Sequence, residues 1–219
     1  LNMRLSYYLS QSGRLDKAVQ VLEAAHERWS NNDQVSYFLA LGYDDQKRPR
    51  EAISLLEKVV ALKPGLRDAR YQLGVIYEKT GQMTQAEAAF RALLAEKPDD
   101  AAVLNYLGYA LAERGLRLDE AEAAIRRAVA LEPANAAYRD SLGWVHYKQG
   151  KSSEAIVDLL KAADALPEDE TIADHLGDAF AASGDKRAAW RYWKRAESLF
   201  GAGERLPEKA AKIEKELGG

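Results

Sequence analysis

Apolar residues recur along this chain with a period longer than one helix. A leucine returns at intervals of 34, 34, 34, 35 and 34 residues, at Leu5, Leu39, Leu73, Leu107, Leu142 and Leu176. An alanine follows each leucine 13 or 14 residues later, at Ala18, Ala52, Ala86, Ala121, Ala155 and Ala189. Self-similarity at a fixed period of this length predicts an array of stacked structural units.

Each unit has the pattern of a helix, a turn and a second helix. A glycine separates leucine from alanine in five units, at Gly13, Gly81, Gly115, Gly150 and Gly184. Glycine is suited to the end of a helix because it adopts a positive φ without strain. Four units close on a proline, which cannot continue a helix, at Pro64, Pro98, Pro133 and Pro167. Lys47 replaces the glycine of the second unit, so an irregular turn is expected there.

The two helices of a unit are expected to pack closely. A small residue follows each leucine, at Ser6, Ala40, Gly74, Gly108, Gly143 and Gly177. A bulky apolar residue of the second helix can then pack against it, at Leu22, Leu56, Phe90, Ile125, Leu159 and Trp193. Such a hairpin leaves one apolar face that only a neighbouring unit can cover.

The third unit resembles the tetratricopeptide-repeat (TPR) consensus. It reads Leu73-Gly74-x-x-Tyr77-x-x-x-Gly81-x4-Ala86-x3-Phe90 and ends at Pro98. The resemblance implies an all-α fold, a right-handed TPR superhelix, which is an α-solenoid of antiparallel helix pairs. The expected array covers residues 1–203, in six units at 1–32, 33–66, 67–100, 101–135, 136–169 and 170–203.

A C-terminal capping helix is predicted over residues 204–219. Gly201-Ala202-Gly203 breaks the repeat, and Ala210, Ile213 and Leu217 then form one narrow apolar stripe. A solenoid needs such a cap to remain soluble. No equivalent segment precedes the first unit. The chain opens at Leu1 without an initiator methionine, so it is expected to be a piece of a longer protein.

The family resemblance also places the expected binding surface. In TPR proteins, the face of the first helix that lies opposite the core lines a concave groove. At about 100° per residue, this face holds the positions two before and two, five and six after each leucine. The groove residues expected to contact a partner are Tyr7, Tyr37, Leu41, Tyr71, Val75, Glu78, Asn105, Tyr109, Asp140, Trp144, Tyr147 and Asp178. Tyrosine and tryptophan are enriched in protein interfaces, although these rings would also suit packing between adjacent first helices.

The same face is rich in acidic residues. Eight acids stand on it or beside it, at Asp44, Asp45, Asp68, Glu78, Glu113, Asp140, Asp174 and Asp178. The only two bases counted there are Lys79 and Lys148. This excess favours a partner segment with basic and apolar character, and the alternative is an ordinary solvated face.

Composition and motifs argue against other functions. With 31 Lys and Arg against 34 Asp and Glu, the net charge of −3 argues against nucleic acid as the main ligand. The absence of cysteine excludes disulfides and thiolate chemistry, and no run approaches the roughly 18 apolar residues of a membrane span. His26, His146 and His175 lack metal-ligand spacing, and His146 is expected in the core. Without a phosphate loop or catalytic motif, no enzyme activity and no cofactor are predicted.

The predicted function is that of a non-catalytic adaptor that binds a protein or peptide partner in the groove. The alternative is a structural module that self-associates, for example into a homo-oligomer through its uncapped N-terminal edge. The last three units, at residues 105–111, 140–145 and 174–178, also resemble a group of proteobacterial TPR proteins. Some of these are envelope lipoproteins that bring substrates to a periplasmic protease. This resemblance favours a bacterial source and the cell envelope or periplasm over the cytoplasm.

Overall fold

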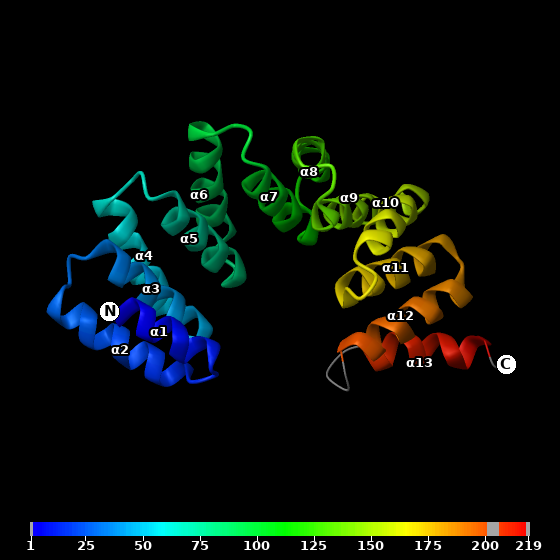
Figure 1. Cartoon of the computed structure of the whole chain (residues 1–219). Helices are drawn as coiled ribbons and strands as arrows, with labels where there is room; N and C mark the ends of the chain where they lie inside the picture. Colours follow the sequence, from blue (N-terminus) through cyan, green and yellow to red (C-terminus); the bar gives the residue numbers. More distant parts are fainter. Residues whose placement is uncertain (1, 201–205, 218–219) are drawn as a thin grey trace. The chain divides into compact units, whose positions relative to one another are not determined.

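The described structure consists of helical hairpins and one further helix. The computed structural model describes residues 2–200 and 206–217, and every regular element within them is an α-helix (Figure 1). This result confirms the predicted all-α fold of paired helices. The chain divides into two compact units, unit 1 at Leu1–Pro98 and unit 2 at Asp99–Gly219.

Unit 1 holds three hairpins. Its helices are α1 (Asn2–Gln11), α2 (Leu15–Arg28), α3 (Asp33–Asp45), α4 (Pro49–Leu62), α5 (Arg67–Lys79) and α6 (Met83–Glu96). Each odd-numbered helix, here called a first helix, packs against the even-numbered second helix that follows it. The second helices α2 and α4 also pack against the next first helix, so each hairpin covers its neighbour.

Unit 2 holds three hairpins and one further helix. Its helices are α7 (Ala101–Glu113), α8 (Leu118–Leu131), α9 (Ala136–Lys148), α10 (Ser152–Ala165), α11 (Glu170–Ser183), α12 (Lys186–Phe200) and α13 (Leu206–Leu217). α13 packs against α12. Direct packing between first helices is extensive here, because α9 contacts both α7 and α11. The predicted break at residues 201–203 and the side chain of Leu217 lie outside the described residues.

The turns inside the hairpins share one geometry, including the turn expected to be irregular. The five glycines that end first helices have positive φ, and Lys47 adopts the same left-handed conformation at φ 61°. The backbone N–H of Arg48 donates to the Tyr43 carbonyl at 2.8 Å, as that of Gln82 does to Tyr77 after a glycine turn. The expected irregularity is therefore wrong, because the hydrogen bonds that end the helix are kept with lysine. The one 35-residue interval is accommodated instead at Arg117, with φ 43°.

The small residue after each leucine is where the hairpin closes most tightly. A Cβ added to Gly108 would lie 2.6 Å from Ile125 Cγ1 and 2.9 Å from the carbonyl oxygen of Ala121. At Gly177 the added atom would lie 2.2 Å from Cδ1 of Trp193. Both Ile125 and Trp193 are buried. The contact expected from the sequence, a bulky side chain against a small residue, therefore sets how closely the two helices approach.

The repeat leucines form the core except at the N-terminal edge. Leu39, Leu73, Leu107, Leu142 and Leu176 are all buried. Leu5 on α1 is 47% exposed. Ala210 of α13, 34 residues after Leu176, is buried in a cluster with Ala173 and Trp193. α13 thus continues the register of the first helices.

We predict that Gly108→Ala lowers the stability of the array by about 1–3 kcal/mol, because the new Cβ would overlap the backbone of α8 as well as Ile125. Urea unfolding followed by far-UV circular dichroism measures this loss. Gly65→Ala is the matched control, since no heavy atom lies within 4 Å of its added Cβ. Equal unfolding midpoints for the two variants would contradict the packing role of Gly108.

Candidate partner-binding surface

One pair of sequence positions recurs on neighbouring first helices. The first member stands two places after the leucine of one first helix, and the second stands one place before the leucine of the next. We call each such pair a register pair. Unit 1 has the register pairs Tyr7/Phe38 and Leu41/Gln72, and unit 2 has Tyr109/Ser141, Trp144/His175 and Asp178/Lys209, with Ala210 taking the leucine position in α13.

In unit 2 the register pair Trp144/His175 fills the space between α9 and α11. The two rings stack with centroids 4.0 Å apart and planes 18° apart. Trp144 is only 7% exposed, and its Nε1 donates to Glu113 Oε2 at 2.7 Å. Tyr147 stacks on Trp144 at 4.9 Å. This aromatic stack therefore packs α9 against α11.

A buried hydrogen bond holds the His175 ring in the stack. His175 Nδ1 lies 2.9 Å from Asp140 Oδ1, and both side chains are buried. A carboxylate only accepts, so the Nδ1–H of His175 donates to Asp140. The pair satisfies two polar groups that would be costly to bury alone.

Three of the predicted groove residues are buried, and for Trp144 the structure shows the alternative of packing between adjacent first helices. Trp144 and Asp140 are buried because first helices pack directly on one another in unit 2, where these side chains form the contact. Val75 of α5 is buried in unit 1. The other predicted residues are exposed or partly buried, namely Tyr7, Tyr37, Leu41, Tyr71, Glu78, Asn105, Tyr109, Tyr147 and Asp178.

Two of the partly buried tyrosines are held by other rings of unit 1. Tyr71 makes an edge-to-face contact with Phe90 at 5.8 Å, and Tyr37 makes one with Phe38 at 5.4 Å. Burial, with a smaller contribution from the charge of Asp68, raises the pKa of the Tyr37 hydroxyl. These ring contacts are consistent with the partial burial of both tyrosines.

The chain itself supplies cations to much of the acidic stripe. Lys209 of α13 bonds both Asp174 and Asp178, at distances of 2.7–3.3 Å. Lys79 Nζ lies 3.2 Å from Asp44 Oδ2, and Lys148 Nζ lies 3.8 Å from Glu113 Oε1. The count of eight acids against two bases missed Lys209, which offsets part of the negative charge of Asp174 and Asp178.

In unit 1 the equivalent space between α1 and α3 is open. A cavity of about 610 Å³ lies between α1, α2 and α3. The register pair Tyr7/Phe38 lines it, and these rings are 62% and 42% exposed. The full lining of the cavity is Met3, Arg4, Ser6, Tyr7, Tyr8, Ser10, Leu15, Ala18, Val19, Leu22, Gln34, Phe38, Leu41, Gly42 and Asp45. Of the predicted groove residues, the cavity brings together Tyr7 and Leu41.

Two residues of this surface, Phe38 and Lys209, were missed from the sequence. Both stand one place before the position of the repeat leucine, outside the four positions that the sequence assigned to the groove face. The signal was present, because Lys209 follows Asp174 by the same 35 residues that separate His175 from Asp140. Alignment of α13 on the repeat would have revealed it.

His146 occupies a position that is a tyrosine in the second and third units. There, Tyr43 and Tyr77 donate to Glu23 and Glu57, each 20 residues earlier, at 3.0 and 2.6 Å. His146 stands at the same position of its unit and contacts Arg126 on α8, which is also 20 residues earlier. A side-chain hydrogen bond between a first helix and the preceding second helix is therefore present in all three units, although the residue types differ.

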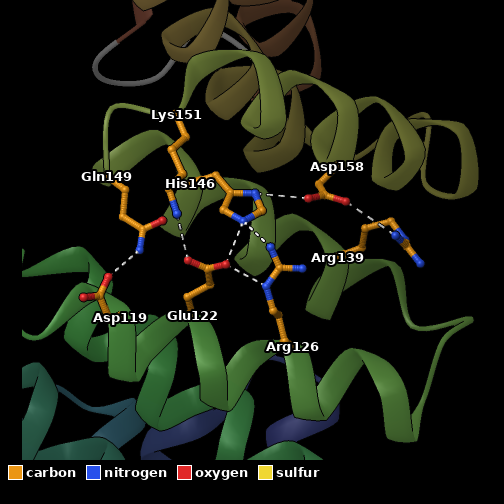
Figure 2. Close-up of polar contacts among 8 residues, drawn as sticks. All are labelled: Asp119, Glu122, Arg126, Arg139, His146, Gln149, Lys151 and Asp158. Atoms are coloured by element: carbon orange, nitrogen blue, oxygen red, sulfur yellow. Dashed lines mark hydrogen bonds and ion pairs between the residues drawn. The ribbon is translucent and has the colours of Figure 1, made fainter.

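A polar cluster surrounds the buried ring of His146 (Figure 2). Arg126 Nη2 lies 3.1 Å from His146 Nε2, which must accept because a guanidinium only donates. Nδ1 lies 3.2 Å from Asp158 Oδ2 without hydrogen-bonding geometry. Glu122 accepts from Arg126 Nε at 2.6 Å and from Lys151 Nζ at 3.1 Å. The cluster links α8, α9 and α10, and Figure 2 shows these side chains converging on the ring.

Metal-binding clusters and membrane-spanning helices are absent from the part of the chain that the structure describes. No group of three or more His, Asp or Glu side chains within it is placed to hold a metal ion. None of its helices has both the length and the apolar character needed to span a bilayer.

Family comparisons identify the repeat. One family model described as tetratricopeptide repeat matches residues 45–108, and a second with the same description matches residues 3–67 and 114–170. A "TPR repeat-containing protein" of Pseudomonas aeruginosa is 34% identical over 179 residues, which are 80% of this chain. The chain spans 30% of the length of that relative.

Solved structures agree on the fold. The type IV pilus biogenesis factor PilW superposes with a TM-score of 0.73 at 22% identity, over 85% of this chain and 92% of PilW. A tetratricopeptide repeat protein of Parabacteroides merdae superposes with a TM-score of 0.73 at 16% identity, over 97% of each chain. At these identities the similarity establishes the arrangement of helices and no more.

We predict that Trp144→Ala destabilises unit 2 by about 3–5 kcal/mol, because it empties the stack on His175 and leaves Glu113 without its indole donor. Urea unfolding followed by circular dichroism reports the loss. Trp29→Ala removes the same side chain from a site that is 47% exposed and should cost much less. Comparable losses for the two variants would refute the buried role of Trp144.

A second prediction concerns acid. Burial alone would raise the pKa of the Glu122 carboxyl, but hydrogen bonds from Arg126, Gln149 and Lys151 outweigh it and lower the pKa from 4.5 to about 2. Because the folded-state pKa lies below the unfolded one, this ionised carboxylate stabilises the fold above pH 4.5. That contribution disappears as the pH falls toward about 2.

We therefore expect Glu122→Gln to unfold at a lower urea concentration than the original chain at neutral pH, with a smaller further loss on acidification. Unfolding midpoints measured at stepwise lower pH provide the test. Glu154→Gln, exposed on α10, should keep the original profile. The interpretation fails if Glu122→Gln retains the full acid sensitivity of the original chain.

Proposed function

Because the chain belongs to the tetratricopeptide-repeat family, whose hairpins generally mediate protein–protein interaction, we propose that it is a non-catalytic adaptor that binds a segment of a partner protein along its first helices. The anchor point of that segment is the cavity between α1, α2 and α3. The observation that carries the proposal is the open register pair Tyr7/Phe38. The equivalent pair in unit 2, Trp144/His175, is already stacked.

The cavity favours one large apolar side chain. A volume of about 610 Å³ between two exposed aromatic rings leaves room for such a group. Burying a large apolar side chain there contributes about 1.5–3 kcal/mol. Aromatic anchors in well-defined pockets commonly dominate binding at protein interfaces. An apolar anchor is thus the main requirement on the partner.

The charges around the cavity set a second requirement. Asp45 on α3 lines it and is exposed, and Arg4 lines it from α1. A basic residue beside the apolar anchor would meet Asp45. The predicted preference for basic and apolar segments therefore still applies at this site. Arg4 on the opposite helix would then favour an acidic or carbonyl group of the partner, so the two charges orient the segment.

Self-association is the second candidate function. Leu5 and Tyr8 on α1 are 47% and 70% exposed, which gives the N-terminal edge an apolar face. Light scattering at several protein concentrations separates the two functions. A mass that rises with concentration, and that Leu5→Ala with Tyr8→Ala abolishes, would favour assembly. A constant monomer mass would favour the adaptor.

A location in the bacterial envelope is part of the same proposal. It is supported by the resemblance of the last three units to proteobacterial envelope proteins and by the Pseudomonas aeruginosa relative. Fractionation of the native bacterium, followed by immunoblotting, tests it. Recovery of the protein with the cytoplasmic fraction would overturn the assignment.

We predict that peptides selected from a random display library on this chain carry a large apolar residue, and that Tyr7→Ala or Phe38→Ala weakens their binding about 10- to 100-fold. Isothermal titration of one selected peptide against each variant gives the affinity. Both rings are exposed, so the unfolding midpoints of the variants should change little.

Trp29→Ala is the control for that experiment, because Trp29 is an exposed aromatic residue of unit 1 that does not line the cavity. Its affinity for the peptide should equal that of the original chain. Selected peptides that bind Tyr7→Ala and Phe38→Ala with undiminished affinity would remove the cavity from the binding site.

A further inference from the structure

α13 docks on α11 as another first helix of the array would. Ala210 stands 34 residues after Leu176, so Lys209 occupies the register position of His175. Lys209 bonds Asp174, 35 residues earlier, as His175 bonds Asp140. The last helix therefore uses the inter-repeat contact of the array, with an ammonium group in place of an imidazole.

The contact of Lys209 is a well-formed ammonium site. Its Nζ lies 3.0 and 3.3 Å from the two carboxylate oxygens of Asp174, and 2.7 and 2.9 Å from those of Asp178. The ring of Trp193 lies 5.8 Å away, and its Nε1 donates to Asp178 at 3.1 Å. Burial alone would lower the pKa of Lys209, but the hydrogen bonds and charges of Asp178 and Asp174 raise it. Two carboxylates around one ammonium select strongly for a cation.

The described side chains anchor α13 through packing as well as through Lys209, because Ala210 and Ile213 pack on the cluster that holds Trp193. Among the side chains of residues 209–214, only Ala210 is buried, while Lys209 and Ile213 are partly buried and the others are exposed. α13 has 12 residues, and a helix of that length is marginal in water without tertiary contacts. The ion pair of Lys209 with the two aspartates therefore acts beside this packing and is the polar contact that the structure shows between α13 and α11 among the described residues.

We propose that the face of α11 bearing Asp174 and Asp178 is a recognition site for a lysine-bearing amphipathic helix of a partner protein, and that α13 occupies this site through Lys209 until such a helix displaces it. The partner helix carries a lysine, a small residue directly after it and an aliphatic residue three places further on, as Lys209, Ala210 and Ile213 do. Charge complementarity supports this occupant, because an ammonium is the group that the two carboxylates hold here. The inference rests on the proposed partner-binding role but concerns a different site.

The probe is a fluorescent synthetic peptide with the sequence of residues 206–217, added to the full chain. Lys209→Gln removes the competing ammonium, so the peptide should bind this variant at least about tenfold more tightly than the original chain. A peptide with glutamine in place of its own Lys209 should lose that gain. Asp174→Asn together with Asp178→Asn, placed in the Lys209→Gln chain, should abolish binding. Lys212→Gln, an exposed lysine one turn along α13, is the matched control and should behave as the original chain does.

Hydrogen–deuterium exchange of α13 gives an independent reading. Its amides should exchange about tenfold faster in Lys209→Gln than in Lys212→Gln, and excess unlabelled peptide should speed their exchange in the original chain as well. The measurement with excess peptide uses the original chain, so it remains valid even if Lys209→Gln fails to fold. Equal exchange in the two variants, or peptide binding that does not need the lysine, would overturn the proposal.

A dimer of Lys209→Gln in light scattering would also overturn it, because a second copy would then be the occupant. The test uses α13 and α11 alone. A negative result therefore does not contradict partner binding in the cavity between α1 and α3. Failure of the cavity variants likewise does not contradict the lysine site on α11.

Discussion

The side chains at the register pairs decide whether the gap between two first helices is closed or open. Where the pair is Trp144 and His175, two stacked rings and the hydrogen bond to Asp140 close it. Where the pair is Asp178 and Lys209, an ion pair closes it. Where the pair is Tyr7 and Phe38, both rings stand apart beside a cavity. One repeated position thus produces three different surfaces on the same scaffold.

The hairpins that carry a glycine after the repeat leucine are closed by a tight steric contact. A glycine such as Gly108 or Gly177 admits the bulky residue of the second helix to within contact of the backbone. The same hydrogen bonds end the first helices, even where Lys47 stands in place of glycine. Variation at exposed and inter-helix positions is therefore free to serve recognition without altering the hairpins.

The hairpins could be predicted from the sequence because, from the second unit on, the repeated leucines lie in the same buried environment. Leu142 and Gly143 have one structural role wherever they recur, so their period is enough to place them. The exposure of the stripe could not be predicted in this way, because it depends on how closely the next first helix approaches. Trp144 therefore looks like a surface residue in the sequence and is buried in the structure. Lys209 was missed because its helix was considered only as a cap, although Ala210 continues the leucine register.

A crystal structure of the chain with a library-selected peptide would test the central claim most directly. We expect a large apolar side chain of the peptide in the cavity lined by Tyr7 and Phe38, in contact with Leu41. A peptide bound elsewhere on the chain, with the cavity between α1 and α3 left unoccupied, would contradict it.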